Sequence, residues 1–413
     1  MEIQNVRSPG GVEAWLVEDR MVPMLAMRFA FEGGSSQDPA GKEGLAHFVT
    51  GMLDQEGGDD LRSIAYQQRI EDLVIRVGFR TGKDYFGGSL ETLTETRHEA
   101  AQLLMPALNL PRFYPDAEER IRHRIFGVIA GGARDPFTIA SAHWDELAFA
   151  GHPYAQPVLG TKATVSKIGL ADLETYCRRV FAKNTLKVVA VGDITRDQLC
   201  ELLDDVFGDL PARADLMPVP DIDVLSGKRQ IVIDMDVPQS AVSFGTAVLP
   251  NDDPDYMAAC LVNHIVGGGG ITSKLMEEVR LKRGLAYSVF TYLAPLHRIS
   301  VFRGGVSTRN DTVGQALDVI GSVLGDLADG GISESDLDDA KGHLIGSYPL
   351  AFDANAKIAS QLLKLRMMGH AADYIDNRNA MIASVTLGDI NRVAKRLLNT
   401  DNLIVAIVGR PTL

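Results

Sequence analysis

The sequence predicts an α+β protein built from two homologous domains, each a mostly antiparallel sheet packed with helices. The first observation is an internal repeat: residues 184–193 (NTLKVVAVGD) resemble residues 401–410 (DNLIVAIVGR) at an offset of 217 residues. The helical patterns before them, residues 169–181 and 386–398, resemble each other at the same offset. The second observation is that strand-like runs alternate with runs whose apolar residues recur at three and four. Ordered matches at one spacing indicate a duplicated domain.

The expected elements follow the same order in each half. Residues 22–31 (VPMLAMRFAF) and 237–246 (VPQSAVSFGT) resemble each other at an offset of 215 residues and are expected to be early strands. Residues 187–194 are expected to form a late strand, and residues 91–110 and 311–328 are expected to be helices. Early strands followed by helices favour α+β layering, and a βαβ repeat on a parallel sheet is the less favoured alternative.

The joint between the copies is expected within residues 211–229, where three prolines interrupt any helix or central strand. We therefore predict an N-terminal domain at residues 1–213, a linker at 214–228 and a C-terminal domain at 229–413. Each copy would have about 200 residues, which is within the ordinary size of a domain.

Composition and charge exclude several classes of protein. A hydrophobic content of 46% and a charged content of 23% are typical of a soluble globular chain. The net charge of −13 argues against a nucleic-acid partner, because phosphate backbones attract basic surfaces. No apolar run reaches the roughly 18 residues that cross a bilayer. We expect no membrane span and a soluble protein, periplasmic if a leader was removed and otherwise cytoplasmic.

The three cysteines, Cys177, Cys200 and Cys260, are too few and too scattered for a disulfide framework or a zinc cluster. We interpret them as small buried apolar residues.

Five sets of motifs occur in an order that is similar to the pitrilysin/insulinase family of zinc peptidases. They are residues 43–53 (EGLAHFVTGML), 110–129 (LPRFYPDAEERIRHRIFGVI), 149–161 (FAGHPYAQPVLGT), the paired VGD and VGR strand ends, and 267–289 (GGGGITSKLMEEVRLKRGLAYSV). The last segment is the most specific. The resemblance covers essentially the whole chain and is to the short two-domain form shared with mitochondrial processing peptidase subunits. It implies the fold of those metallopeptidases, which LuxS shares, in both domains.

The resemblance also implies a metal site that this chain lacks. Active members carry His, two residues, Glu, His on one helix, so that two imidazoles at i and i+4 reach one zinc and the Glu acts as general base. His47 matches the first ligand, whereas Thr50 replaces the general base and Gly51 replaces the second histidine. The alternative for His47 is an ordinary polar residue on a half-buried helix.

A second helix supplies a Glu ligand in the family, with an auxiliary Glu seven residues before it. When residues 110–129 are aligned with the family without a gap, Ile121 falls at the auxiliary position and Val128 at the metal-binding position. One imidazole cannot supply the three protein ligands of such a site. We therefore expect no metal in this chain and no catalytic residue in this chain alone.

The second half matches the family better. The family's C-terminal domain lends an Arg and a Tyr to the substrate cleft, and Arg280 and Tyr287 occupy those places. A guanidinium can bind a peptide carbonyl, and a tyrosine hydroxyl can stabilise an oxyanion. The alternative is a solvated charge at a helix end and an aromatic residue packed in a strand.

Two further segments carry expectations of their own. Residues 267–270 are four glycines that do not match the phosphate-loop pattern, and we expect them to form a flexible turn. His152 is expected to fix its loop by hydrogen bonding.

The leading hypothesis is a non-catalytic subunit of a heterodimeric zinc endopeptidase. Its partner would be a homologous subunit that carries the zinc motif and the zinc, and the ligand would be a peptide substrate. A structural or peptide-binding protein without a role in proteolysis, like core subunits of respiratory complexes, is the second hypothesis. A homodimer that binds or sequesters peptides is the third.

Overall fold

The computed structural model describes residues 1–56, 63–109, 111–222, 227–249, 253–297 and 299–413. The chain forms two compact units, neither of which is one continuous segment. Unit 1 consists of Met1–Ile129, Pro157–Val219 and Pro349–Tyr374. Unit 2 consists of Ala130–Gln156, Pro220–Tyr348 and Ile375–Leu413.

Each unit thus combines most of one half of the sequence with a segment of the other half. The boundaries 1–213, 214–228 and 229–413 stay a prediction about the repeat. Within the expected linker, residues 223–226 lie outside the described residues.

Unit 1 contains a six-stranded sheet in the order β1-β2-β6-β3-β5-β4, in which only the pair β2–β6 is parallel. Its strands are β1 (Gln4–Arg7), β2 (Glu13–Glu18), β3 (Met24–Glu32), β4 (Arg76–Thr81), β5 (Tyr85–Leu93) and β6 (Lys187–Gly192). Its helices are α1 (Leu45–Glu56), α2 (Ser63–Asp72), α3 (Arg97–Asn109), most of α4 (Pro115–Gly132), α6 (Lys162–Val165), α7 (Leu170–Val180), α8 (Arg196–Phe207) and α12 (Asn355–Met367).

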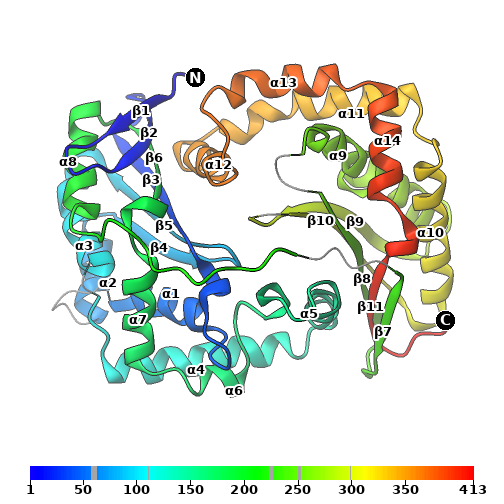
Figure 1. The fold of residues 1–413 in the computed structure, drawn as a ribbon, viewed down its shortest axis with the longest axis horizontal. Coiled ribbons are helices and arrows are strands. Elements are labelled where there is room, and N and C mark those ends of the chain that lie inside the picture. The colour runs from blue at the N-terminus through cyan, green and yellow to red at the C-terminus, as the bar shows by residue number, and fades with distance from the viewer. Residues whose placement is uncertain (57–62, 110, 223–226, 250–252, 298) are drawn as a thin grey trace. The chain divides into compact units, whose positions relative to one another are not determined.

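The two faces of this sheet are covered differently. Alternate residues of β3, such as Phe29 and Phe31, belong to the main core that α1, α3, α7 and α8 also line. Arg28 points to the other face, where its Nε donates to the Ser360 hydroxyl of α12 at 3.2 Å. Helix α12 lies against β3 and β6 (Figure 1). A helix from the second half of the sequence therefore covers the sheet of the first half.

Unit 2 contains a five-stranded sheet in the order β7-β11-β8-β10-β9, in which only the pair β7–β11 is parallel. Its strands are β7 (Arg229–Ile233), β8 (Gln239–Leu249), β9 (Ala286–Pro295), β10 (Ser300–Arg309) and β11 (Ile404–Val408). Its helices include α5 (Pro136–Ala148), α9 (Tyr256–Asn263), α10 (Val313–Ala328), α11 (Glu334–Gly346), most of α13 (Tyr374–Ser384), α14 (Leu387–Leu397) and the π-helical segments η5 (His264–Gly268) and η7 (Met276–Leu281).

The second sheet repeats the arrangement with the halves exchanged. Phe244 and Phe302 face a core shared with α9, α10 and α14. On the other face lies α5, packed against β8 and β11 (Figure 1). Its Trp144 is fully buried and donates from Nε1 to the carbonyl of Ile404 at 3.1 Å, while the guanidinium of Arg303 stacks on the indole at 4.3 Å. Burying an aromatic ring with its one polar atom satisfied anchors this helix.

The α+β prediction and the internal repeat are confirmed. The repeated segments form β6 and β11, each of which lies between a parallel and an antiparallel neighbour, and α7 and α14 before them. Gly192 and Gly409 end the two strands with φ of +138° and +143°. A Cβ at Gly192 would lie 2.1 Å from the carbonyl oxygen of Met24, so the VGD turn requires glycine.

Two expectations need correction. Residues 91–93 continue strand β5, and the helix expected at residues 91–110 begins at Arg97 after a short 3-10 turn. Among the cysteines only Cys177 is buried, because Cys200 and Cys260 lie at partly exposed positions. In the part of the chain that the structure describes, no helix has the length and apolarity needed to cross a membrane.

Candidate functional site

Helix α1, which contains His47, Thr50 and Gly51, begins beside a buried carboxylate. Asp38 Oδ2 and Oδ1 accept the backbone N–H groups of Gly44 and Ala46 at 2.8 and 2.9 Å, which satisfies donors at the start of α1. Burial raises the pKa of Asp38 to about 7, and the nearby carboxylate of Glu43 acts in the same direction. These N–H bonds act in the opposite direction. The Asp38 carboxylate therefore fixes the start of α1.

His47, Thr50 and Gly51 lie on the face of α1 that the motif predicts. The hydroxyl of Thr50 is turned back onto the helix and donates to the His47 carbonyl at 2.7 Å, so the side chain at the general-base position binds its own backbone. A Cβ added at Gly51 would lie 2.8 Å from Ile121 Cγ2 and 2.9 Å from an Nη2 of Arg124. Helix α4 therefore packs directly against Gly51, where the resemblance would place the second histidine.

The two positions on α4 that the resemblance aligns with the family's metal site carry apolar side chains. Ile121 is fully buried and belongs to the unit 1 core, and Val128 is 50% exposed. Neither offers an atom that can coordinate a metal. Across the described residues, no three His, Cys, Asp or Glu side chains are grouped so as to hold a metal ion. The side chains at these positions do not fit the zinc of the active members, since a catalytic zinc needs three protein ligands.

Sequence reasoning missed Arg124, whose charge acts on both His47 and Asp54, and it missed the burial of Asp54. Burial lowers the pKa of His47, and the positive charge of Arg124 lowers it further. Burial raises the pKa of Asp54 to about 6, against the Phe79 N–H bond at 2.8 Å and the charge of Arg124. Asp54 follows His47 by seven residues, which is two helical turns, and this spacing was the available signal.

Arg280 and Tyr287 are brought together in unit 2. Arg280 belongs to the π-helical segment η7, and Tyr287 is the second residue of β9. The guanidinium carbon lies 4.5 Å from the centroid of the Tyr287 ring, within the range of a cation–π contact. The Tyr287 side chain is 82% exposed. The tyrosine is thus not a packed aromatic of the sheet, which was the alternative interpretation.

A β-bulge sets the direction of Tyr287. On β10, Val306 pairs with Val289 and Thr308 pairs with Ala286, so three steps along β9 match two along β10. The extra residue lies in the segment Tyr287–Ser288, and both of its residues are exposed. A bulge re-aims side chains that a regular pleat would send to opposite faces.

Ion pairs surround the segment that carries Arg280. Lys274 binds Asp336 of α11 at 2.6 Å, and Lys282 binds Glu277 and Glu278 at 2.9 and 2.6 Å. The Val279 carbonyl accepts the Leu285 N–H at 2.9 Å, which closes the turn into β9. The basic neighbours of Arg280 therefore have carboxylate partners.

The expected turn at residues 267–270 is only partly a turn. Gly267 and Gly268 end the π-helical segment η5, and a Cβ at Gly267 would lie 2.7 Å from the backbone nitrogen of Thr291. Glycine is needed there because the helix touches strand β9. Gly270, with φ of +65°, makes the actual turn.

His152 fixes its loop as expected. Its Nδ1 accepts the Tyr154 N–H at 3.1 Å, so Nε2 carries the proton and donates to the carbonyl of Pro220 at 3.0 Å. Both nitrogens are satisfied within unit 2, which leaves none for a metal.

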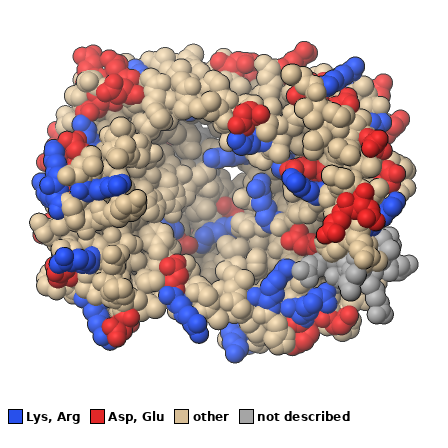
Figure 2. Space-filling model, turned by 180° about the vertical axis from the view of Figure 1, so that it is seen from behind, with Lys and Arg blue, Asp and Glu red and all other residues tan. Residues whose placement is uncertain are grey.

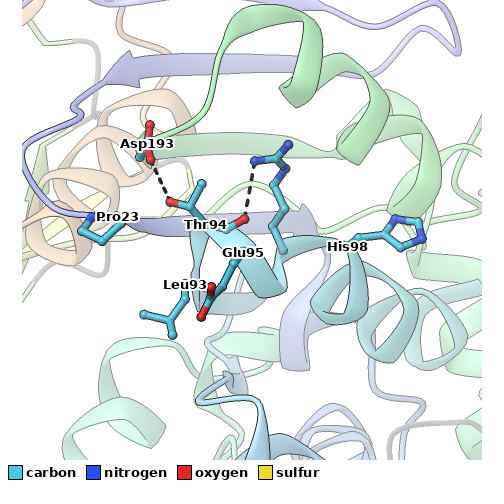
Figure 3. A pocket seen from close by; sticks show the side chains of 7 residues that line it. Pro23, Leu93, Thr94, Glu95, His98 and Asp193 are labelled. Carbon is cyan, nitrogen blue, oxygen red and sulfur yellow. Dashed lines mark hydrogen bonds between the residues drawn. The ribbon is translucent and has the colours of Figure 1, made fainter.

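A hollow of about 560 Å³ in unit 1 was not anticipated from the sequence. Its polar groups bind one another: Thr94 donates to Asp193 at 3.0 Å, Arg97 donates to the Thr94 carbonyl at 3.5 Å, and His98 points away from them (Figure 3). These groups do not converge on a common point.

The surface charges do not mark a site either. Figure 2 shows basic and acidic side chains interspersed on the face in view, without an extended patch of either sign.

The chain is similar to proteins of one family over its whole length. The family model for the peptidase M16 inactive domain matches residues 167–344. The non-peptidase homolog YmxG of Helicobacter pylori is 28% identical over 393 residues, covering 95% of this chain and 90% of that protein. An uncharacterized zinc protease of Mycobacterium tuberculosis is 26% identical, covering 89% of this chain and 84% of that protein.

A solved structure has the same fold. The peptidase M16 inactive domain from Pseudomonas fluorescens superimposes with a TM-score of 0.93 at 27% identity, covering 100% of this chain and 98% of that chain. These similarities agree with the resemblance of the motifs.

Proposed function

We propose, from the premise that this chain belongs to the M16 peptidase family of pitrilysin and insulinase, that it is the non-catalytic subunit of a heterodimeric zinc endopeptidase. In this proposal a homologous partner subunit carries the zinc and the general base. This chain contributes Arg280 and Tyr287 to the binding of the peptide substrate.

The observation that carries the proposal is the contrast between the two sets of family positions. On α1 and α4 the side chains at four of the five metal-site positions cannot do the chemistry, whereas Arg280 and Tyr287 are both present and in contact. An exposed tyrosine hydroxyl beside a guanidinium offers donors for a peptide carbonyl or a developing oxyanion. A chain selected only for its fold has no need of this pair.

The experiment combines the purified chain with a zinc-motif homologue from the same genome. We expect peptide cleavage that depends on both chains and falls at least about tenfold with Arg280→Ala or Tyr287→Phe, because each removes a donor to the substrate. Arg309→Ala is the matched control, since Arg309 is an exposed arginine of the same unit that pairs with Asp311. Its activity should equal that of the unsubstituted pair.

Two outcomes would contradict the proposal. One is stoichiometric zinc in the purified chain together with cleavage by that chain alone. The other is stable binding of the homologue with no gain in cleavage, which would favour a structural or peptide-binding role instead.

A further inference from the structure

Helices α1 and α4 meet at the position that a second zinc ligand would occupy. Gly51 has no side chain, and the space beyond its Cα is filled by Ile121 Cγ2 and Arg124 Nη2, at 2.8 and 2.9 Å from a Cβ built there. Side-chain Cβ atoms do not approach other heavy atoms so closely. A histidine at Gly51 would therefore have to displace the Ile121 and Arg124 side chains before it could bind anything.

Arg124 also places a positive charge at this position. Its field acts on His47 and on Asp54, which precede and follow Gly51 on α1. An arginine remains protonated at every pH of interest. A divalent cation held beside His47 would be repelled by this guanidinium at short range, where the partly buried surroundings screen charge weakly.

Absence of ligands and presence of Arg124 are separate obstacles to metal binding. His47 would supply one ligand, and substitutions could supply the others. The guanidinium would still lie beside Gly51, where its positive charge also favours the ionised form of Asp54. Restoring ligands alone would leave two cations competing for one space.

We propose that Arg124 replaces the metal cation in this chain, so that its guanidinium closes the former site to zinc independently of the lost ligands. The role is one of exclusion, and it concerns unit 1 alone. It does not depend on a partner subunit or on Arg280 and Tyr287.

Two substituted chains test the proposal by zinc content after dialysis and by competition with a chromogenic chelator. The first carries Gly51→His and Val128→Glu, which together with His47 make three ligands, and Ile121→Ala, which relieves the contact with Ile121. The second adds Arg124→Ala. We expect one zinc per chain in the second and an affinity at least about 100-fold lower in the first, because only the first retains the opposing charge.

The matched control adds Arg120→Ala to the first chain instead. Arg120 is an exposed arginine one turn earlier on α4, and its removal should leave the affinity low. Equal zinc affinity in the first and second chains would overturn the proposal. A folded second chain, verified by circular dichroism, that binds no zinc would also overturn it.

A further measurement needs no restored ligands. In the otherwise unsubstituted chain, Arg124→Ala should raise the pKa of His47, followed by the NMR shift of its imidazole, and Arg124→Lys should leave it low. Both variants keep Asp54, on which the charge of Arg124 also acts. An unchanged His47 titration in Arg124→Ala would show that the guanidinium does not act at this position.

Discussion

The guanidinium carbon of Arg280 lies 4.5 Å from the ring centroid of Tyr287, although a helical segment, a turn and the start of a strand separate the two residues. The contact orients the arginine over a ring that is 82% exposed. Both side chains thus present polar groups to solvent while holding each other in place.

The stability of the chain should depend little on this pair. A cation–π contact at an exposed site contributes about 0.5–1 kcal/mol, so Arg280→Ala and Tyr287→Ala should each lower the free energy of unfolding by less than about 1 kcal/mol. Urea unfolding followed by circular dichroism measures this. A loss of several kcal/mol would assign the pair to the fold and weaken its assignment to peptide binding.

The close packing of α1 against α4 should require glycine at position 51. Gly51→Ala gains helix propensity but forces Ile121 or Arg124 to move, and we expect a net loss of about 1–2 kcal/mol in the free energy of unfolding. Gly127 on α4 is the matched control, because a Cβ there meets nothing within 4 Å. Gly127→Ala should stabilise the chain by up to about 1 kcal/mol. Equal gains for both variants, again in urea, would contradict the close packing.

The packing of α12 against the unit 1 sheet should depend on Arg366. Its Nη1 donates to the Val188 carbonyl at 2.6 Å and the Glu13 carbonyl at 3.3 Å, and its guanidinium lies over the Trp15 ring at 5.3 Å. Burial lowers the pKa of Arg366, which reflects the cost of holding this charge away from water.

Arg366→Met should cost about 2–3 kcal/mol, because it leaves strand carbonyls without their charged donor. Lys357→Met on the same helix is the control, since Lys357 forms an exposed pair with Asp353 and should cost less than about 0.5 kcal/mol. Trp15 fluorescence and urea unfolding report both effects. Similar losses in the two variants would argue against a special role of Arg366.

Asp54 should make stability depend on pH. Its pKa is raised from 3.8 to about 6, so the folded chain holds this proton more tightly than the unfolded chain does. The resulting stability is fully present below the unfolded pKa and is lost as the pH rises through about 6. Asp54→Asn keeps an acceptor for Phe79 and removes this loss.

The difference in unfolding free energy between Asp54→Asn and the unsubstituted chain should therefore grow by about 2 kcal/mol from about pH 4 to about pH 7. Urea unfolding at several pH values measures it. Parallel pH profiles would mean that Asp54 ionises in the folded chain as it does in the unfolded one.

Much of the fold could be predicted because it is written in local patterns and in a repeat. The apolar runs at residues 187–192 and 404–408 and their repetition predicted the central strands, and the helical patterns predicted α7, α10 and α14. The late start of α3 could not be predicted, since the pairing of β5 with β3 extends the strand to Leu93. The exchange of α5 and α12 between units left no local signal, because an amphipathic helix does not specify which sheet it covers.

The sequence by itself predicted the α+β fold, because its repeat and periodicity are local properties. Its resemblance to the zinc peptidases predicted that Thr50, Gly51, Ile121 and Val128 stand at metal-site positions and that Arg280 and Tyr287 stand at substrate-binding positions. Only the tertiary structure decided which side chains lie next to Gly51 and in which direction Tyr287 points. Arg124 lies beside Gly51, and the bulge in β9 exposes Tyr287 next to Arg280, because packing between helices and pairing between strands bring together residues that are distant in the chain.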